Sequence, residues 1–139
     1  MSVAGKRQAG FTLLETLVVV AITAMIATIV APEMMRALDI LTLHQSARLL
    51  QADLRVARAT AIRTGQKVDL EASNHGHEYD WIGGTRYLPP AITLSMSGPY
   101  VVYPDGSIQP ATITLTSQKR NVTLTVDAVT GAVTTANAQ

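Results

Sequence analysis

The sequence predicts an α+β fold in which a long N-terminal helix packs on an antiparallel β-sheet domain. Two patterns predict it. Apolar side chains dominate residues 11–31 and then recur at helical spacing as far as residue 64. Beyond Gly65 apolar and polar side chains alternate, as they do in half-buried strands. We therefore expect a leader at 1–10, a transmembrane helix at 11–31, its amphipathic continuation at 32–64 and a β-rich domain at 65–139.

The segment 11–31 is long enough to cross a membrane. Its only polar side chains are Glu15 and four threonines. Its roughly 21 residues, at about 1.5 Å each, span about 32 Å, which is close to the hydrocarbon thickness of a bilayer. Lys6 and Arg7 precede the segment, so we expect the N-terminus to remain in the cytoplasm and the C-terminal domain to face the periplasm or the exterior.

Glu15 is the one charged side chain in this apolar segment. A charge at the centre of a membrane helix costs about 2.5–3.5 kcal/mol. In a plain single-pass anchor, Glu15 would reach towards the headgroups, about 6 Å away. Alternatively it has a cationic partner. Cleavage between Gly10 and Phe11 would remove only the leader, retain the helix and create such a cation, the new amino terminus of Phe11, which a neighbouring subunit can supply.

Residues 36–64 predict an amphipathic helix that continues the membrane segment. Gly65 predicts its end. Pro32 lacks a backbone donor and can bend the join, but we predict a single helix of about 54 residues, roughly 80 Å long. Its apolar positions, spaced four and three residues apart, form one stripe: Leu43, Ala47, Leu50, Leu54, Ala57 and Ala61.

Strands are predicted where apolar and polar residues alternate. Turn residues at 74–76, 83–84, 104–106 and 130–131 separate them. We expect the apolar stripe of the helix to lie on the inner face of the antiparallel sheet that they form. The predicted strands lie at 67–72, 92–96, 113–115 and 122–126.

Residues 10–15, with the sequence GFTLLE, resemble the class III signal of type IV pilins and of type II secretion pseudopilins, as does the apolar run that follows. The resemblance implies a type IV pilin-like fold and a prepilin peptidase that cleaves after Gly10 and methylates the new N-terminal Phe11. It also implies that Glu15 is needed for filament assembly. Pro32 falls where the family has a proline.

The resemblance continues beyond the membrane segment. Residues 54–65 (LRVARATAIRTG) look like the end of the helix in the H-type pseudopilin and in its pilus relative, the T-type minor pilin. Residues 103–107 (YPDGS) and 130–133 (TGAV) resemble later turns of that domain, and the match is least clear at 73–100. The chain thus resembles a minor pseudopilin of the type II secretion system, H type, in the GspH/FimT-like domain family.

This family implies a structural role in the periplasmic pseudopilus, near its tip, in support of the export of folded proteins across the outer membrane. The implied partners are other minor and major pseudopilins, the prepilin peptidase, and the inner-membrane assembly platform with its ATPase. The chain would be a single-pass protein of the bacterial inner membrane, with its C-terminal domain in the periplasm. A minor pilin of a type IV pilus, acting in assembly, twitching or DNA uptake, is the alternative, and a plain membrane anchor with a periplasmic binding domain is a third possibility.

No catalytic residues, cofactor or metal site are expected. His75, His77 and Glu78 have spacing that suits two ligands on one strand face, but no third ligand can be assigned and His75 adjoins a glycine turn, so we favour a solvated loop. No nucleophile motif, phosphate-binding loop or paired-carboxylate arrangement is present. The chain has no cysteine, unlike many pilins, which close their C-terminal region with a disulfide.

Nucleic acid is not expected as a partner. Four arginines at 48, 55, 58 and 63 make the helix basic, but residues 65–139 carry four basic and six acidic side chains, and residues 127–139 have no Lys or Arg. We therefore expect the arginines on a solvated or subunit-facing surface. Tyr79, Trp81 and Tyr87 flank a Gly-Gly turn, and the sequence leaves open whether they fill the core or form a contact surface.

Overall fold

The structure, a computed structural model, describes residues 12–118 and 120–138. These residues form a long helix, α1 (Leu13–Thr64), a short 3-10 helix, η1 (Asn74–Gly76), and eight strands. The chain divides into two compact units, Met1–Ala37 and Leu38–Gln139, and each is described by itself below.

The predicted continuous helix is observed. Helix α1 includes Pro32 and ends at Thr64. Gly65 follows with φ +66°, a conformation that glycine adopts without strain, and its N–H donates to the carbonyl oxygen of Ala61 at 3.0 Å. Glycine therefore ends the helix at the position where the sequence predicts its end.

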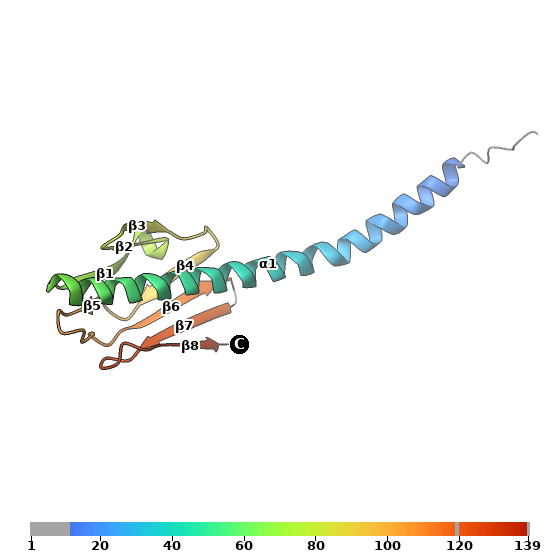
Figure 1. The fold of residues 1–139 in the computed structure, drawn as a ribbon. Coiled ribbons are helices and arrows are strands. Elements are labelled where there is room, and N and C mark those ends of the chain that lie inside the picture. Colours follow the sequence, from blue (N-terminus) through green and yellow to red (C-terminus); the bar gives the residue numbers. More distant parts are fainter. Residues whose placement is uncertain (1–11, 119, 139) are drawn as a thin grey trace, which may run out of the picture. The chain divides into compact units, whose positions relative to one another are not determined.

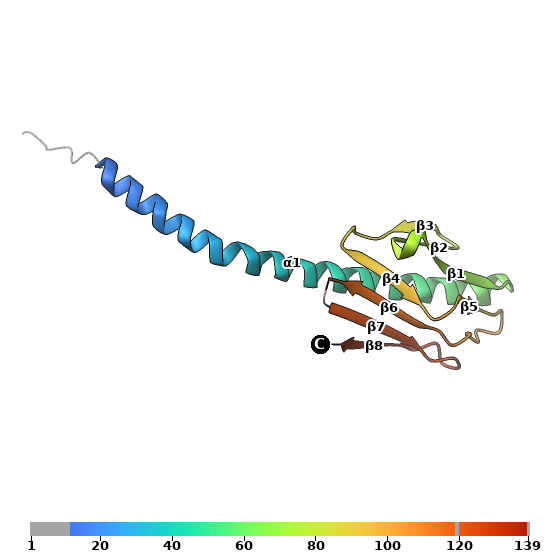
Figure 2. The same cartoon turned by 180° about the vertical axis from the view of Figure 1, so that it is seen from behind.

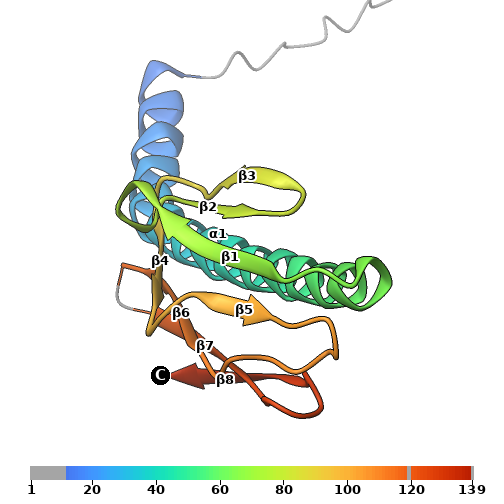
Figure 3. The same ribbon diagram turned by 90° about the vertical axis from the view of Figure 1, so that its left-hand side faces the viewer.

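The β-rich part contains two four-stranded sheets, not the single sheet expected from the sequence. Their strand orders are β3-β2-β1-β5 and β4-β6-β7-β8, and every pair is antiparallel. Figures 1 and 2 show the sheets beside the green part of α1, and Figure 3 shows β2 and β3 on one side of it and β6 to β8 on the other. The strands are β1 (Val68–Ser73), β2 (Glu78–Trp81), β3 (Gly84–Tyr87), β4 (Ile92–Met96), β5 (Tyr100–Val102), β6 (Thr112–Ser117), β7 (Arg120–Val126) and β8 (Val133–Ala138).

The four predicted strands are confirmed as β1, β4, β6 and β7, whereas β2, β3, β5 and β8 were not predicted. Each missed strand lacks the alternating signal for a physical reason. The three residues of β5 are all buried, so they show no alternation. Strands β2 and β3 have only four residues each, and β8 has a single large apolar residue, Val133.

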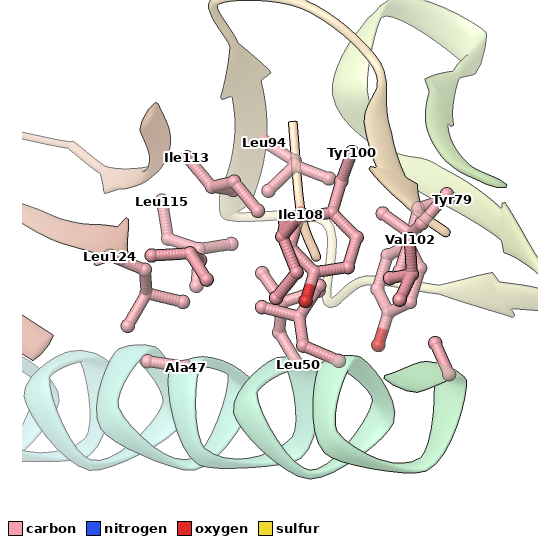
Figure 4. Close-up of a cluster of buried hydrophobic side chains, with 14 of the residues drawn as sticks. Ala47, Leu50, Tyr79, Leu94, Tyr100, Val102, Ile108, Ile113, Leu115 and Leu124 are labelled. Atoms are coloured by element: carbon pink, nitrogen blue, oxygen red, sulfur yellow. The ribbon is translucent and has the colours of Figure 1, made fainter. Parts of the chain in front are cut away.

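The apolar stripe of α1 forms one wall of the core, as predicted. All six of its residues are at most 5% exposed. In Figure 4, Ala47 and Leu50 lie on the helix beneath side chains from the strands, among them Leu115 and Leu124. The alanines have short side chains that let the backbones approach closely, and each buried leucine contributes about 1.5–3 kcal/mol through the hydrophobic effect. Because this stripe faces the core, the side chains on the other faces of this part of α1 point towards loops or solvent.

Candidate assembly site

The first part of α1 has the composition of a membrane-crossing segment. Its most apolar stretch has a mean hydropathy of 2.4, and none of that stretch is buried within the protein. Leu13, Met25 and Ile29 are each at least 66% exposed, which is unfavourable in water and favourable in lipid. Farther along, Arg36 Nη1 lies 2.7 Å from Glu33 Oε1, so these two exposed side chains cancel each other's charge.

The threonines of this segment satisfy their hydroxyl groups within the helix. Thr23 Oγ1 donates to the carbonyl oxygens of Val19 and Val20, each at 2.9 Å. Thr28 Oγ1 donates to that of Met25 at 2.7 Å. A polar group without a partner is costly in hydrocarbon, so these bonds make the threonines compatible with a bilayer.

Glu15 lies in the first turn of α1. Thr12 Oγ1 accepts a hydrogen bond from its backbone N–H at 3.3 Å, which is the contact of an N-cap residue. The partial positive charge at a helix N-terminus favours a carboxylate at this position. Gly10 and Phe11, the predicted cleavage pair, lie outside the described residues. Glu15 is exposed and lies near the N-terminal end of α1. The predicted cleavage would create a free amino group close to this end of the chain.

Arg58 joins α1 to two distant turns. Its Nε donates to the carbonyl oxygen of Gly106 at 3.0 Å. Its Nη1 donates to the carbonyl oxygen of Thr130, and its Nη2 donates to that of Val129 at 3.5 Å. A planar guanidinium carries five N–H donors in fixed directions, so it can bridge several carbonyl groups at once. Arg58 thereby holds both turns against the helix.

Each of these turns is also closed by its own aspartate. Asp105 Oδ1 accepts hydrogen bonds from the hydroxyl and the N–H of Ser107, at 2.6 and 2.9 Å. Asp127 Oδ1 accepts from the N–H and the hydroxyl of Thr130, at 2.7 and 2.8 Å. These bonds favour the charged carboxylates, so the pKa of each aspartate is lowered, chiefly by the Ser107 hydroxyl for Asp105 and by the Thr130 N–H for Asp127.

Arg58 thus brings together the three segments that carry the resemblance beyond the membrane helix, residues 54–65, 103–107 and 130–133. The prediction of a solvated or subunit-facing surface holds for Arg58 only in part, because the side chain is half-buried and its guanidinium is bound to backbone carbonyl groups. The arginines at 48, 55 and 63 are exposed, as expected. Sequence separation hid the role of Arg58, since its partners lie 48 and 72 residues away.

A buried carboxylate, also unpredicted, fastens β2 and β3 to α1. The hydroxyl of Tyr79 donates to Asp53 Oδ2 at 2.7 Å. Arg86 lies on the other side, with Nε 2.7 Å from Oδ2 and Nη2 donating to Oδ1 at 3.2 Å. Burial, followed by the bond to Asp53, raises the pKa of Tyr79 far above its usual range, so the phenol stays protonated. Asp53 is 6% exposed, and its two partners compensate for its lost hydration.

The three aromatic side chains near the Gly-Gly turn have different environments. Tyr79 is fully buried, Trp81 is half-buried against the core with Arg86 5.8 Å above its ring, and Tyr87 is 75% exposed. The structure therefore places one of the three in the core and leaves Tyr87 available for contacts.

The histidines considered as metal ligands lie in a turn. His75 is in η1 with φ +56°, and His77 follows it. Gly76 approaches the backbone of Leu94 so closely that a Cβ there would overlap the Leu94 carbonyl group. Within the described part of the chain, no group of three or more His, Asp or Glu side chains is arranged to hold a metal ion.

Two sequence families match the chain, and together with the helix and sheets they define its class. Residues 5–31 match the prokaryotic N-terminal methylation motif. Residues 46–131, more than half of the chain, match the family described as Type II transport protein GspH. The chain therefore belongs to the GspH family. No curated protein sequence matches it.

Solved structures share the fold. The minor pseudopilin EpsH from the Type 2 Secretion System of Vibrio cholerae is 13% identical, with a TM-score of 0.59 over 68% of this chain and 96% of EpsH. The type IV minor pilin FimU of Pseudomonas aeruginosa is 14% identical, with a TM-score of 0.57 over 70% of this chain and 92% of FimU in one crystal form and 98% in another. At such low identity these likenesses establish the fold alone. The GspH family supports a minor pseudopilin or type IV pilin-like role for the chain, as a structural subunit.

Proposed function

We propose that this protein is a minor pseudopilin of the type II secretion system. The observation that carries the proposal is the match of residues 46–131 to the GspH family, behind an N-terminal methylation motif. The subunit is held in the bacterial inner membrane by α1, with its β-rich domain in the periplasm. From there it is assembled into the periplasmic pseudopilus, near the tip, and supports the export of folded proteins across the outer membrane.

The proposed mechanism is assembly. The prepilin peptidase cuts between Gly10 and Phe11 and methylates Phe11. The inner-membrane platform and its ATPase then drive the subunit into the filament, where it contacts other minor and major pseudopilins. Glu15 pairs with the amino terminus of a neighbouring subunit, so its charge has a partner within lipid. This ion pair forms only in the assembled filament, where it offsets the free energy of placing the carboxylate in the membrane. The position of Glu15 in the first turn of α1 supports this role.

A minor pilin of a type IV pilus is the second candidate. The likeness to FimU, whose TM-score is within 0.02 of that to EpsH, favours it as a specific observation. Such a subunit would act in pilus assembly, twitching or DNA uptake. Direct binding of nucleic acid remains disfavoured, because residues 65–139 carry more acidic than basic side chains.

A deletion strain separates the two candidates. We expect loss of exoprotein secretion, with twitching and transformation retained, and restoration by a plasmid copy of the gene. Loss of twitching or transformation with normal secretion would replace the secretion role with the pilus role. The same strain, complemented with chain variants, provides the background for the assembly measurements described below.

A further inference from the structure

The face of α1 that points away from the core carries a second stripe of residues. Its members follow one another at intervals of seven, four, three, four and three residues, so they lie on one side of the helix, roughly opposite the stripe that enters the core. All are exposed, and its two large apolar side chains are 58% and 53% exposed. We call this set the outer stripe: Leu41, Arg48, Ala52, Arg55, Ala59 and Ile62.

The outer stripe has the residue pattern of a helix-on-helix contact. Ala52 and Ala59, seven residues apart, have short side chains that let a second helix approach closely. Such a helix would also cover Leu41 and Ile62, whose exposure to water is unfavourable. The stripe belongs to the second unit and lies beyond the apolar segment 11–31, so lipid does not account for its exposed apolar side chains.

A groove opens beside the C-terminal half of the outer stripe. It has a volume of about 290 Å³ and is bounded by Gly131 and by five residues of α1. Four of these, at positions 55, 58, 59 and 62, have the i, i+3, i+4 and i+7 spacing of a hole that receives one side chain of a partner helix. Arg58 is already bound to carbonyl groups of the turns, so Arg55 is the guanidinium that the groove offers to a ligand.

The arginines of the outer stripe have no counter-charge within the described part of the chain. None of the salt bridges found there includes Arg48 or Arg55. The two arginines lie seven residues apart, about 10.5 Å along the helix axis. Between residues 40 and 64 the one acidic residue is Asp53, and it is buried. The same part of a second copy would therefore bring arginine against arginine.

We infer that the outer stripe binds an acidic amphipathic helix of a partner protein, with a glutamate of that helix seated in the groove. The carboxylate of this glutamate accepts hydrogen bonds from Arg55, and its aliphatic stem lies against Ala59 and Ile62. A second acidic side chain of the partner, one heptad away, pairs with Arg48. The partner is a different chain, because α1 offers no exposed acid over residues 40–64.

Nucleic acid suits the outer stripe less well than an acidic helix does. Phosphate groups are attracted by charge, and the stripe offers two arginines among alanines and large apolar side chains, which phosphate would not cover favourably. The inference rests on the proposed assembly role only in that a neighbouring subunit of the filament would supply the helix. Failure of the binding test below would leave the outcome of the deletion strain, and hence the proposed function, unaffected.

Two matched peptides test the inference on the full chain in non-ionic detergent micelles. One is three repeats of Glu-Ala-Gln-Leu-Ala-Gln-Ala, and its twin has glutamine in place of each glutamate. Both carry fluorescein, whose anisotropy reports binding, and micelles without the protein give the background. We expect saturable binding of the acidic peptide, about tenfold tighter than that of its twin, because two exposed ion pairs each contribute modestly. Added salt should reduce this difference.

Variants of the chain assign the binding to the outer stripe. Arg48→Gln and Arg55→Gln should each weaken binding of the acidic peptide about threefold without lowering the unfolding midpoint, since both side chains are exposed. Ala59→Phe should abolish binding, because the larger side chain fills the groove. Arg120→Gln, the same charge change on β7, is the matched control and should leave binding unchanged.

Charge reversal makes the test reciprocal. The double variant Arg48→Glu/Arg55→Glu should prefer a third peptide, with lysine in place of each glutamate, about tenfold over the acidic one. Equal binding of the acidic peptide and its glutamine twin, or an equal loss with Arg120→Gln, would overturn the inference. Self-association of the chain that Ala59→Phe abolishes would also overturn it, as would tighter binding of single-stranded oligothymidylate than of the acidic peptide at the same salt concentration.

Discussion

The two units of this chain differ in how far apart in sequence the partners of their polar side chains lie. In the described part of Met1–Ala37, the side-chain hydrogen bonds join residues three or four positions apart, as in Thr23 to Val19. In Leu38–Gln139, some side chains of α1 bond locally in the same way, as Thr42 does to Leu38, but others reach strands and turns 26 to 82 residues away. Helix α1 runs through both units, so the difference lies in what surrounds it. Lipid offers no polar partner, whereas folded strands and turns offer many.

This contrast implies two kinds of sensitivity. Changes in the first unit should affect processing and assembly while leaving the fold of the second unchanged. Changes in the second should lower its free energy of unfolding without altering leader removal. The following variants test that division.

Gly10→Ala should have the largest effect. We expect leader removal to be largely blocked, because the peptidase requires a small flexible residue before the cut, and we expect unchanged folding of the second unit. Gel mobility of the membrane-bound chain measures cleavage, and protease resistance of the β-rich domain reports its folding. If the variant chain is still shortened by the length of the leader, residues 10–15 are not a class III signal.

Glu15→Leu should leave cleavage intact and strongly reduce incorporation into filaments. Removing the charge also removes an insertion cost, which is below the figure of about 2.5–3.5 kcal/mol for a helix centre because Glu15 lies in the first turn, so membrane insertion should be equal or better. Fractionation of sheared filaments and secretion in the complemented deletion strain provide the measurements. Glu33→Gln, an exposed acid past the apolar stretch, is the matched control and should behave as wild type. Normal incorporation of the Glu15 variant would exclude this glutamate from assembly.

Asp53→Ala should destabilise the second unit by about 2 kcal/mol, because the buried Tyr79 hydroxyl loses its acceptor and Arg86 its counter-charge. The cost stays moderate since Arg86 is partly exposed and can be hydrated. Denaturant unfolding followed by the fluorescence of Trp81 measures it. Asp39→Ala, a carboxylate on the same helix whose partner Gln118 is exposed, should cost less than about 0.5 kcal/mol. Equal losses in the two variants would contradict the proposed fastening role.

The smallest effect, and the sharpest comparison, should be the difference in stability between two paired glycine substitutions. Gly65 and Gly131 both have φ +66°, so alanine at either position costs about 1 kcal/mol in backbone strain. A Cβ at Gly65 meets no atom within 4 Å, whereas one at Gly131 would overlap the Arg58 guanidinium. We therefore expect Gly131→Ala to cost about 1 kcal/mol more than Gly65→Ala in thermal unfolding.

The difference in stability between Gly131→Ala and Gly65→Ala should disappear in an Arg58→Ala background, because the guanidinium that the new Cβ would overlap is then absent. Its persistence there would show that the turn at 130–131 does not depend on Arg58. Cleavage of the leader should be the same in all of these variants, because none of them lies near the signal.

Among the described residues, the sequence predicted the elements whose signal is local. The apolar stripe from Leu43 to Ala61, the end of α1 at Gly65 and four of the strands followed from periodicity and from turn residues. Strand β5 escaped because both of its faces are buried, and β8 because threonine and alanine alternate without an apolar contrast. The roles of Asp53 and Arg58 escaped because nothing local distinguishes them from the other charged residues of α1.

By itself the sequence determined the long apolar segment, the match to the N-terminal methylation motif and the face of α1 that enters the core, because each depends on local spacing. It also predicted the cleavage site and the role of Glu15, which stay predictions. Only the tertiary structure decided that the strands form two sheets and that Arg58 binds the turns while the other helix arginines stay exposed. The reason is physical. Strand pairing and carbonyl binding join residues far apart in the chain, and their energies depend on which groups the folded backbone brings within hydrogen-bonding distance.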